Sequence, residues 1–294
     1  MRNSRQNTVV SRQGIVCLLS TVYCLLNPVN VHAARADKAA DPAALQTLGV
    51  TYAEKGEWDK SIDALKRALA LDPNNSEIYV DLSLAYAEKE DFDHAVTFAQ
   101  KAVALAPKNA NAYHTLGLAY EGLGEVDKAI STYKQGLQAN AKNSDLHLTL
   151  GNLYGRQRNF TDAVKAYEQA IKADPKNSFA YSNLAYIYQE KSDHNKAIEY
   201  LIAATKADPK DPVAWYDLGS GYDKKGDTDK AIEYFEKSFS LNPKSYKAAI
   251  SLAMAYEKKR NLEKAAGYYV KAMDLMDDPR LKEAILRQMT RAKE

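Results

Sequence analysis

Apolar and small residues recur along the chain with a period of 34 residues, from residue 42 to residue 279. The seventh position of every 34-residue unit is Leu and the eleventh is Tyr, while the eighth and twenty-seventh positions are always small. Positions 4, 7, 8 and 11 share one face of a helix, and positions 20, 21, 24, 27 and 28 share one face of a second helix. The pattern therefore predicts a pair of helices in each unit. The units begin, without insertion or deletion, at Pro42, Ser76, Ala110, Ser144, Ser178, Pro212 and Tyr246.

Short polar side chains precede the predicted helices, where they can accept hydrogen bonds from free backbone amides. Those expected to cap the first helices, at position 34 of the preceding unit, are Asn75, Asn109, Asn143, Asn177, Asp211 and Ser245. Those expected to cap the second helices, at position 16, are Asp91, Asn159, Asp193, Asp227 and Asn261. One helical hairpin cannot bury its own apolar face, so the units are expected to stack on one another. The stripe of Leu281, Ala284, Ile285 and Met289 predicts a C-terminal capping helix in residues 280–294.

This combination of Leu, small residue and Tyr, followed by a small residue at position 20, resembles the tetratricopeptide repeat family. The match covers about four fifths of the chain, and five units also carry the Pro of the family pattern at position 32. The resemblance implies an all-α fold, a right-handed α-solenoid of seven 34-residue helix-turn-helix repeats. The repeats are 42–75, 76–109, 110–143, 144–177, 178–211, 212–245 and 246–279.

Residues 1–36 have the features of a secretory signal peptide: four Arg, no acidic residue, and the apolar run of residues 15–26. Cleavage is expected after Ala33 or Ala36, which leaves residues 37–41 as a short linker. The alternative, an uncleaved membrane anchor, is disfavoured because a span needs about 20 apolar residues. Both cysteines, Cys17 and Cys24, lie in this segment, so disulfides and thiolate chemistry are not expected after cleavage. We expect an exported protein, periplasmic or secreted.

Composition narrows the classes of partner. With 46% hydrophobic and 27% charged residues, the chain has enough apolar side chain to fold. The 40 basic and 38 acidic residues nearly balance, and no block of five like charges is present, so nucleic acid is not an expected partner. The 20 tyrosines are explained in part by the seven at position 11.

Motifs for catalysis or for metal and nucleotide binding are absent from the sequence. The segment Gly219-Ser220-Gly221 lies inside a predicted helix and lacks the spacing of a nucleophile elbow. Acidic pairs such as Asp227 and Asp229 are attributed to helix capping. We therefore expect no catalytic residue, no metal and no cofactor.

The family resemblance also implies where a partner binds. Positions 2, 5, 6, 9, 12 and 13 of the first helices tend to face a concave groove, and they vary between repeats in this chain. Aromatic and amide groups in the middle repeats are typical of a surface that holds an extended peptide. The alternative, that some of them pack between neighbouring repeats, stays open. The candidate groove residues are His114, Thr115, Leu118, Asn152, Arg156, Phe179, Asn183, Tyr186, Gln189, Tyr216, Asp217 and Ser220.

These observations predict an exported, non-enzymatic adaptor or scaffold that binds a protein or peptide. Family resemblance suggests cell-envelope assembly, secretion or pilus biogenesis as settings. The alternative is a regulatory or substrate-presenting subunit of a separate enzyme or protease. No stable membrane span is expected once the leader has been cleaved.

Overall fold

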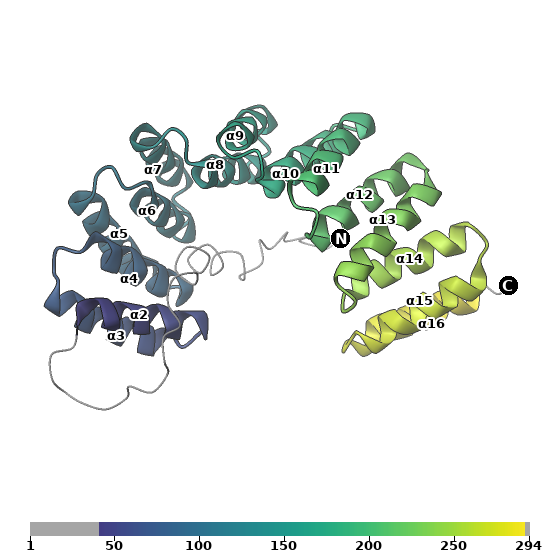
Figure 1. The fold of residues 1–294 in the computed structure, drawn as a ribbon, viewed down its shortest axis with the longest axis horizontal. Helices are drawn as coiled ribbons and strands as arrows, with labels where there is room; N and C mark the ends of the chain where they lie inside the picture. Colours follow the sequence, from purple (N-terminus) through teal and green to yellow (C-terminus); the bar gives the residue numbers. More distant parts are fainter. Residues whose placement is uncertain (1–40, 292–294) are drawn as a thin grey trace. The chain divides into compact units, whose positions relative to one another are not determined.

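The computed structural model describes residues 41–291, in which helices α2 to α16 are present and no strand occurs. The predicted export segment and most of the linker that follows it lie outside the described residues. Two compact units divide the chain, with the boundary between Ala141 and Lys142. In both, consecutive helices pack side by side as antiparallel pairs (Figure 1).

The first unit contains three helical hairpins. They are α2 (Pro42–Glu54) with α3 (Trp58–Leu71), α4 (Ser76–Glu88) with α5 (Phe92–Leu105), and α6 (Ala110–Gly122) with α7 (Val126–Ala139). The second unit contains four hairpins and a last helix. They are α8 (Ser144–Arg156) with α9 (Phe160–Ala173), α10 (Ser178–Glu190) with α11 (His194–Ala207), α12 (Pro212–Lys225) with α13 (Thr228–Leu241), α14 (Tyr246–Lys258) with α15 (Leu262–Asp274), and α16 (Pro279–Arg291).

The helices begin where the sequence pattern places them. Each first helix starts at the first residue of a 34-residue unit, and the predicted fold class of helix-turn-helix repeats is confirmed. The capping predictions are also confirmed. Asn75, for example, accepts a hydrogen bond from the backbone amide of Glu77, and Asp91 accepts one from that of His94.

The turn within each hairpin contains a left-handed backbone residue at position 15, with φ between 59° and 87°. Glycine adopts this conformation without steric cost, whereas other residues pay for the contact between Cβ and the backbone. The seven residues are Gly56, Glu90, Gly124, Arg158, Ser192, Gly226 and Arg260.

Small residues at position 8 bring the two helices of a hairpin close together, as the pattern predicted. A Cβ on Gly151 would come within 2.6 Å of the ring of Tyr167, and one on Gly219 within 2.6 Å of the ring of Phe235. The repeated Leu at position 7 is buried in six repeats but 41% exposed at Leu48. In the described residues, no hairpin precedes α2 to cover that face.

The repeated Tyr at position 11 has a cationic partner that the sequence analysis did not identify. A Lys side chain at position 19 lies over this ring in five repeats, as with Lys230 over Tyr222 at 4.8 Å from the ring centroid. In the second repeat position 19 is His94, whose ring stacks on Tyr86 at 4.9 Å, and Lys66 of the first repeat lies over the same tyrosine ring at 5.5 Å from its centroid. The tyrosine thus contributes a cation–π contact as well as apolar area.

The C-terminal helix α16 buries a narrower stripe than predicted. Ile285 is 7% exposed and joins the core of the second unit, and Met289 packs against it. Leu281 and Ala284, which lie on the same apolar stripe, are exposed. The reason is that α16 packs mainly on α15, with a hydrogen bond from Gln288 Nε2 to Glu257 Oε2 of α14 at 3.3 Å, so that the rest of its circumference is left uncovered in the described residues.

Candidate functional site

Hydrogen bonds between successive first helices organise one face of the second unit. The donor and acceptor are separated by 35 residues in three of these contacts, one residue more than the repeat. Each of these bonds therefore joins a residue of one repeat to the residue that lies one repeat position later in the next repeat. Lys224 Nζ donates to Gln189 Oε1 at 2.6 Å, and Lys258 Nζ donates to Asp223 Oδ1 at 2.6 Å. We call the face formed by α8, α10, α12 and α14 the first-helix surface.

Four of the predicted binding residues are engaged with neighbouring repeats on this surface. Asn152 Oδ1 accepts hydrogen bonds from Asn183 Nδ2 at 2.8 Å and from the Tyr167 hydroxyl at 2.9 Å. The hydroxyl of Tyr216 accepts one from Ser251 Oγ at 3.2 Å. Together with Gln189, these residues link neighbouring first helices. For these four residues, the structure therefore shows packing between repeats, the alternative to a free binding surface that the sequence left open.

Two predicted aromatic residues remain open to solvent on the same surface. Phe179 is 65% exposed, the largest value for a large apolar side chain in the described residues, and Tyr186 is 54% exposed. They occupy positions 2 and 9 of α10. The equivalent positions on α12 and α14 carry Val213, 59% exposed, and Met254, 43% exposed. Apolar side chains thus lie exposed beside the hydrogen-bonded polar residues.

Three further predicted residues lie on α8 and α12. Arg156 is exposed in the last turn of α8, while Asp217 and Ser220 are half-buried. Burial and the negative charge of Asp211 raise the pKa of Asp217 to about 6. The structure therefore leaves Arg156 more accessible than the other two.

The remaining candidates, His114, Thr115 and Leu118, belong to α6 in the first unit. Thr115 is 4% exposed, and its hydroxyl donates to the carbonyl oxygen of Ala112 at 3.0 Å. Thr115 is interior because position 6 of a first helix faces the neighbouring repeat. Asp81 and Asn183, at the same position, are hydrogen-bonded to neighbouring repeats. His114 lies 6.0 Å from Tyr133 between ring centroids, and burial lowers its pKa to about 4. Leu118 is half-buried.

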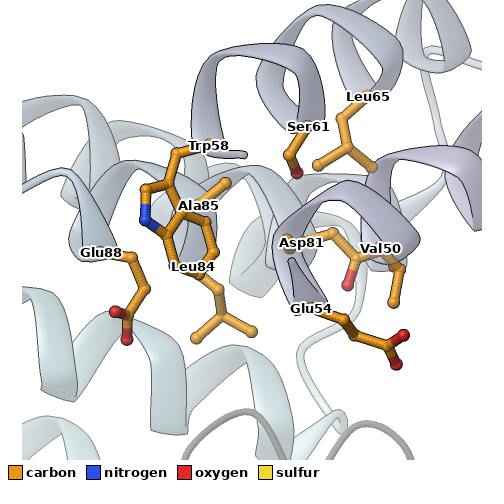
Figure 2. A pocket seen from close by; sticks show the side chains of 10 residues that line it. Val50, Glu54, Trp58, Ser61, Leu65, Asp81, Leu84, Ala85 and Glu88 are labelled. Atoms are coloured by element: carbon orange, nitrogen blue, oxygen red, sulfur yellow. The ribbon is translucent and has the colours of Figure 1, made fainter. Parts of the chain in front are cut away.

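A pocket between α2, α3 and α4 was missed by the sequence analysis (Figure 2). Asp81, Glu54, Glu88 and Ser61 line it together with apolar side chains. Two departures from the repeat pattern mark it in the sequence: Ser61 stands where six repeats have Ala, and Leu65 stands where four have Tyr or Phe. The cavity itself is a consequence of packing between hairpins.

Family models match most of the chain. Models described as tetratricopeptide repeat or TPR repeat match residues 49–90, 80–145, 114–177, 148–212, 212–245 and 248–283. The chain belongs to the tetratricopeptide repeat family. This repeat fold is generally non-catalytic and is consistent with a scaffold for protein–protein interaction. Within residues 41–291 of this tetratricopeptide repeat protein, no helix combines the length and apolarity needed to cross a bilayer.

Solved structures similar to this tetratricopeptide repeat protein include PilF of Pseudomonas aeruginosa, at 16% identity and a TM-score of 0.60, covering 72% of this chain and 97% of that one. A tetratricopeptide repeat protein from Parabacteroides merdae has 17% identity and a TM-score of 0.57, with coverages of 85% and 98%. MamA has 29% identity and a TM-score of 0.48, with coverages of 55% and 95%. The first two likenesses show the fold alone, and nothing further rests on the third. No curated protein matches the chain.

Proposed function

We propose that the chain is an exported, non-enzymatic adaptor that binds a protein or peptide on the first-helix surface of its second unit. The observation that carries this proposal is the exposure of Phe179 and Tyr186 beside the polar network of Asn152 and Asn183. Large aromatic side chains contribute strongly to protein interfaces, since they bury much area and lose little conformational entropy. Their exposure in a folded domain is typical of an interaction surface.

The polar network gives this surface a defined arrangement before a partner binds. Bonds such as Lys258–Asp223 and Lys224–Gln189 link successive first helices through their side chains. A preorganised surface loses less conformational freedom on association, which favours affinity. The adaptor would act by holding partners close together, without changing covalent bonds.

Export is the part of the proposal that rests on the N-terminal sequence. The four Arg of residues 1–36, the apolar run and the small residues near Ala33 and Ala36 support cleavage and export. N-terminal sequencing of the protein from its native cells tests this. A mature N-terminus at Ala34 or Asp37 is expected, and retention of Met1 would contradict cleavage.

Crosslinking in the native cells tests the binding surface. We expect Phe179→Ala combined with Tyr186→Ala to reduce capture of partners, because both exposed rings are removed. Val270→Ala is the matched control, since Val270 is 45% exposed but lies on the second helix α15. Equal capture by the double variant and the wild type, with helicity unchanged, would show that this is the wrong surface. A change in the rate of a co-purifying enzyme would instead support a regulatory subunit.

A further inference from the structure

The pocket of the first two repeats lies beside a position where a smaller side chain, Leu65, stands in place of the tyrosine found in three other repeats. Position 24 holds Tyr133, Tyr167 and Tyr269 in three other repeats, and each hydroxyl reaches a polar residue of a first helix. Tyr133 and Tyr167 lie against the Gly at position 8 of their own repeats, where Gly49 in the first repeat instead faces Leu65. Leucine fills less space than tyrosine, and a cavity of about 40 Å³ remains beside it.

Two polar groups at this cavity have unused capacity for hydrogen bonds. Ser61 is fully buried, and its hydroxyl has no hydrogen-bond partner in the described structure. Asp81 is 9% exposed, and its Oδ2 accepts a hydrogen bond from Gln46 Nε2 at 2.7 Å. Among the described residues no other hydrogen bond to this carboxyl group is present, so Oδ1 remains an acceptor. A buried group without a partner is costly, and a ligand that donates hydrogen bonds would relieve that cost.

The charges around the pocket are of one sign. Glu54 and Glu88 line it from α2 and α4, together with Asp81 and Ser61 (Figure 2). No basic side chain is among the residues that line it. The remaining walls are apolar: Val50, Ala53, Trp58, Leu65, Leu84 and Ala85. The pocket thus combines apolar walls with a negative charge, which complements an aliphatic chain that ends in a cation.

The size of the cavity limits the cationic group that can enter. At roughly 10–15 Å³ per water-sized group, the 40 Å³ cavity holds about three to four non-hydrogen atoms. The end of a lysine side chain, two methylene carbons and the ammonium nitrogen, fits within this volume, whereas the four non-hydrogen atoms of a guanidinium group fill it and leave no room for a methylene stem. A divalent metal ion is disfavoured, since the described residues contain no group of three or more side chains placed to hold one.

We infer that this pocket receives the ammonium group of a lysine side chain from a partner protein. Asp81 Oδ1 and Ser61 Oγ accept its hydrogen bonds, Glu54 and Glu88 attract the positive charge, and the methylene groups pack against Val50, Leu65 and Leu84. The inference rests on the proposed protein-binding function and names the chemistry of one contact. It places that contact in the first unit, separate from the aromatic residues of the second.

An NMR titration of the full-length protein tests the inference with two small probes. The first is Nα-acetyl-lysine N-methylamide, and the second is the norleucine equivalent, which has the same aliphatic stem without the charge. We expect the lysine probe to shift the signals of Ser61 and Asp81 saturably, and to bind at least about tenfold more tightly than the norleucine probe, because a charged hydrogen bond is gained. Equal binding of both probes, or no saturable shift, overturns the inference and leaves only a hydrated cavity.

Two variants locate the binding within the pocket. Leu65→Tyr restores the side chain found in three other repeats and fills the cavity, while Asp81→Asn removes the charge and keeps the shape. Both are expected to weaken the lysine probe by at least about tenfold. Asp63→Asn is the matched control, because Asp63 lies on α3 in the same unit but is exposed and does not line the pocket. Circular dichroism checks folding, and Asp81→Asn keeps the test valid if Leu65→Tyr does not fold. Unchanged binding in a folded variant overturns the inference.

Comparison with the crosslinking experiment separates the two proposals. If partners are captured in cells and depend on Phe179 and Tyr186 while the lysine probe does not bind, the pocket inference fails and the adaptor function stands. If no partner is captured at all, the adaptor function fails whatever the probe does.

Discussion

The ring of Tyr133 lies so close to Gly117 that a Cβ at the glycine would come within 2.2 Å of ring atom Cε1. The two residues belong to the two helices of one hairpin, α6 and α7. The absence of a side chain at Gly117 therefore sets how closely those helices pack. This relationship explains why position 8 is small in every repeat while position 24 is aromatic in four of them.

Gly117→Ala is expected to destabilise the first unit by about 1–3 kcal/mol, since the added methyl group must displace the Tyr133 ring. Gly267→Ala is the control, because a Cβ at that helical glycine meets nothing within 4 Å. It should stabilise α15 by about 0.5–1 kcal/mol through helix propensity. Urea unfolding of both variants measures the difference, and destabilisation of equal size in the two would contradict the packing argument.

Ser192→Gly is expected to raise the free energy of unfolding by about 1 kcal/mol. Ser192 has φ 60°, a left-handed conformation that is costly for a residue with a Cβ. The reverse change at the equivalent turn, Gly226→Ala, should lower stability by a similar amount. No atom lies within 4 Å of a Cβ at Gly226, so that loss would come from the backbone alone. Thermal unfolding of both variants checks the opposite signs, and a shift in the same direction would refute the explanation.

Asp81 should make stability depend on pH. Burial and the negative charge of Glu77 raise its pKa in the folded protein to about 7, from an ordinary value of 3.8, and Glu54 and Glu88 line the same pocket. The folded state therefore binds this proton more tightly than the unfolded state. The resulting stability is fully present below the unfolded-state pKa of 3.8, and it is lost as pH rises through the folded-state pKa of about 7.

The asparagine of the Asp81→Asn variant cannot ionise, so the variant should not lose this stability as pH rises. We expect the stability of the variant relative to wild type to rise between about pH 4 and pH 7, by up to about 4 kcal/mol, and to level off above that range. Denaturant unfolding across this range provides the measurement. A constant difference between the two proteins would show that Asp81 has similar pKa values in the folded and unfolded states.

Leu184→Ala and Phe179→Ala should differ greatly in their effect on stability. Leu184 is completely buried, and its truncation is expected to cost about 2–5 kcal/mol. Phe179 lies on the same helix but is 65% exposed, so its truncation should change stability by less than about 0.5 kcal/mol. Calorimetry of the two variants tests this contrast. A large loss from Phe179→Ala would mean that its ring has a structural role.

Local pattern in the sequence was sufficient to place the helices. The first helix of the fourth repeat begins at Ser144 after the cap Asn143, as predicted, because periodicity and capping depend on residues within a few turns of each other. Leu48 is an exception, since this position 7 leucine is exposed. Its burial depends on a hairpin that would pack against α2, and the residue at position 7 alone does not reveal whether one is present. The role of Lys230 over Tyr222 was also missed, because it requires the geometry of the hairpin turn.

The candidate site was predicted less completely, because the same residue type can face solvent or a neighbouring repeat. Asn152 and Phe179 both occupy predicted groove positions, yet one is held by two hydrogen bonds and the other is exposed. The outcome depends on side chains about one repeat away in sequence, which single-repeat patterns do not describe. The pocket at Asp81 arises in the same way, since its walls come from three helices of two repeats.

The periodic sequence is thus enough to specify a tetratricopeptide repeat protein with hairpins at known positions, since helix formation and hairpin pairing are governed by short-range apolar spacing. Tertiary packing determines which polar groups are satisfied, which aromatic rings stay exposed and where a cavity remains. These features depend on volumes and hydrogen bonds summed over neighbouring helices. Leu65 illustrates the difference: the sequence shows an apolar residue at a position where four repeats have Tyr or Phe, and only the packing of Leu65 against Gly49 shows that a cavity remains beside it.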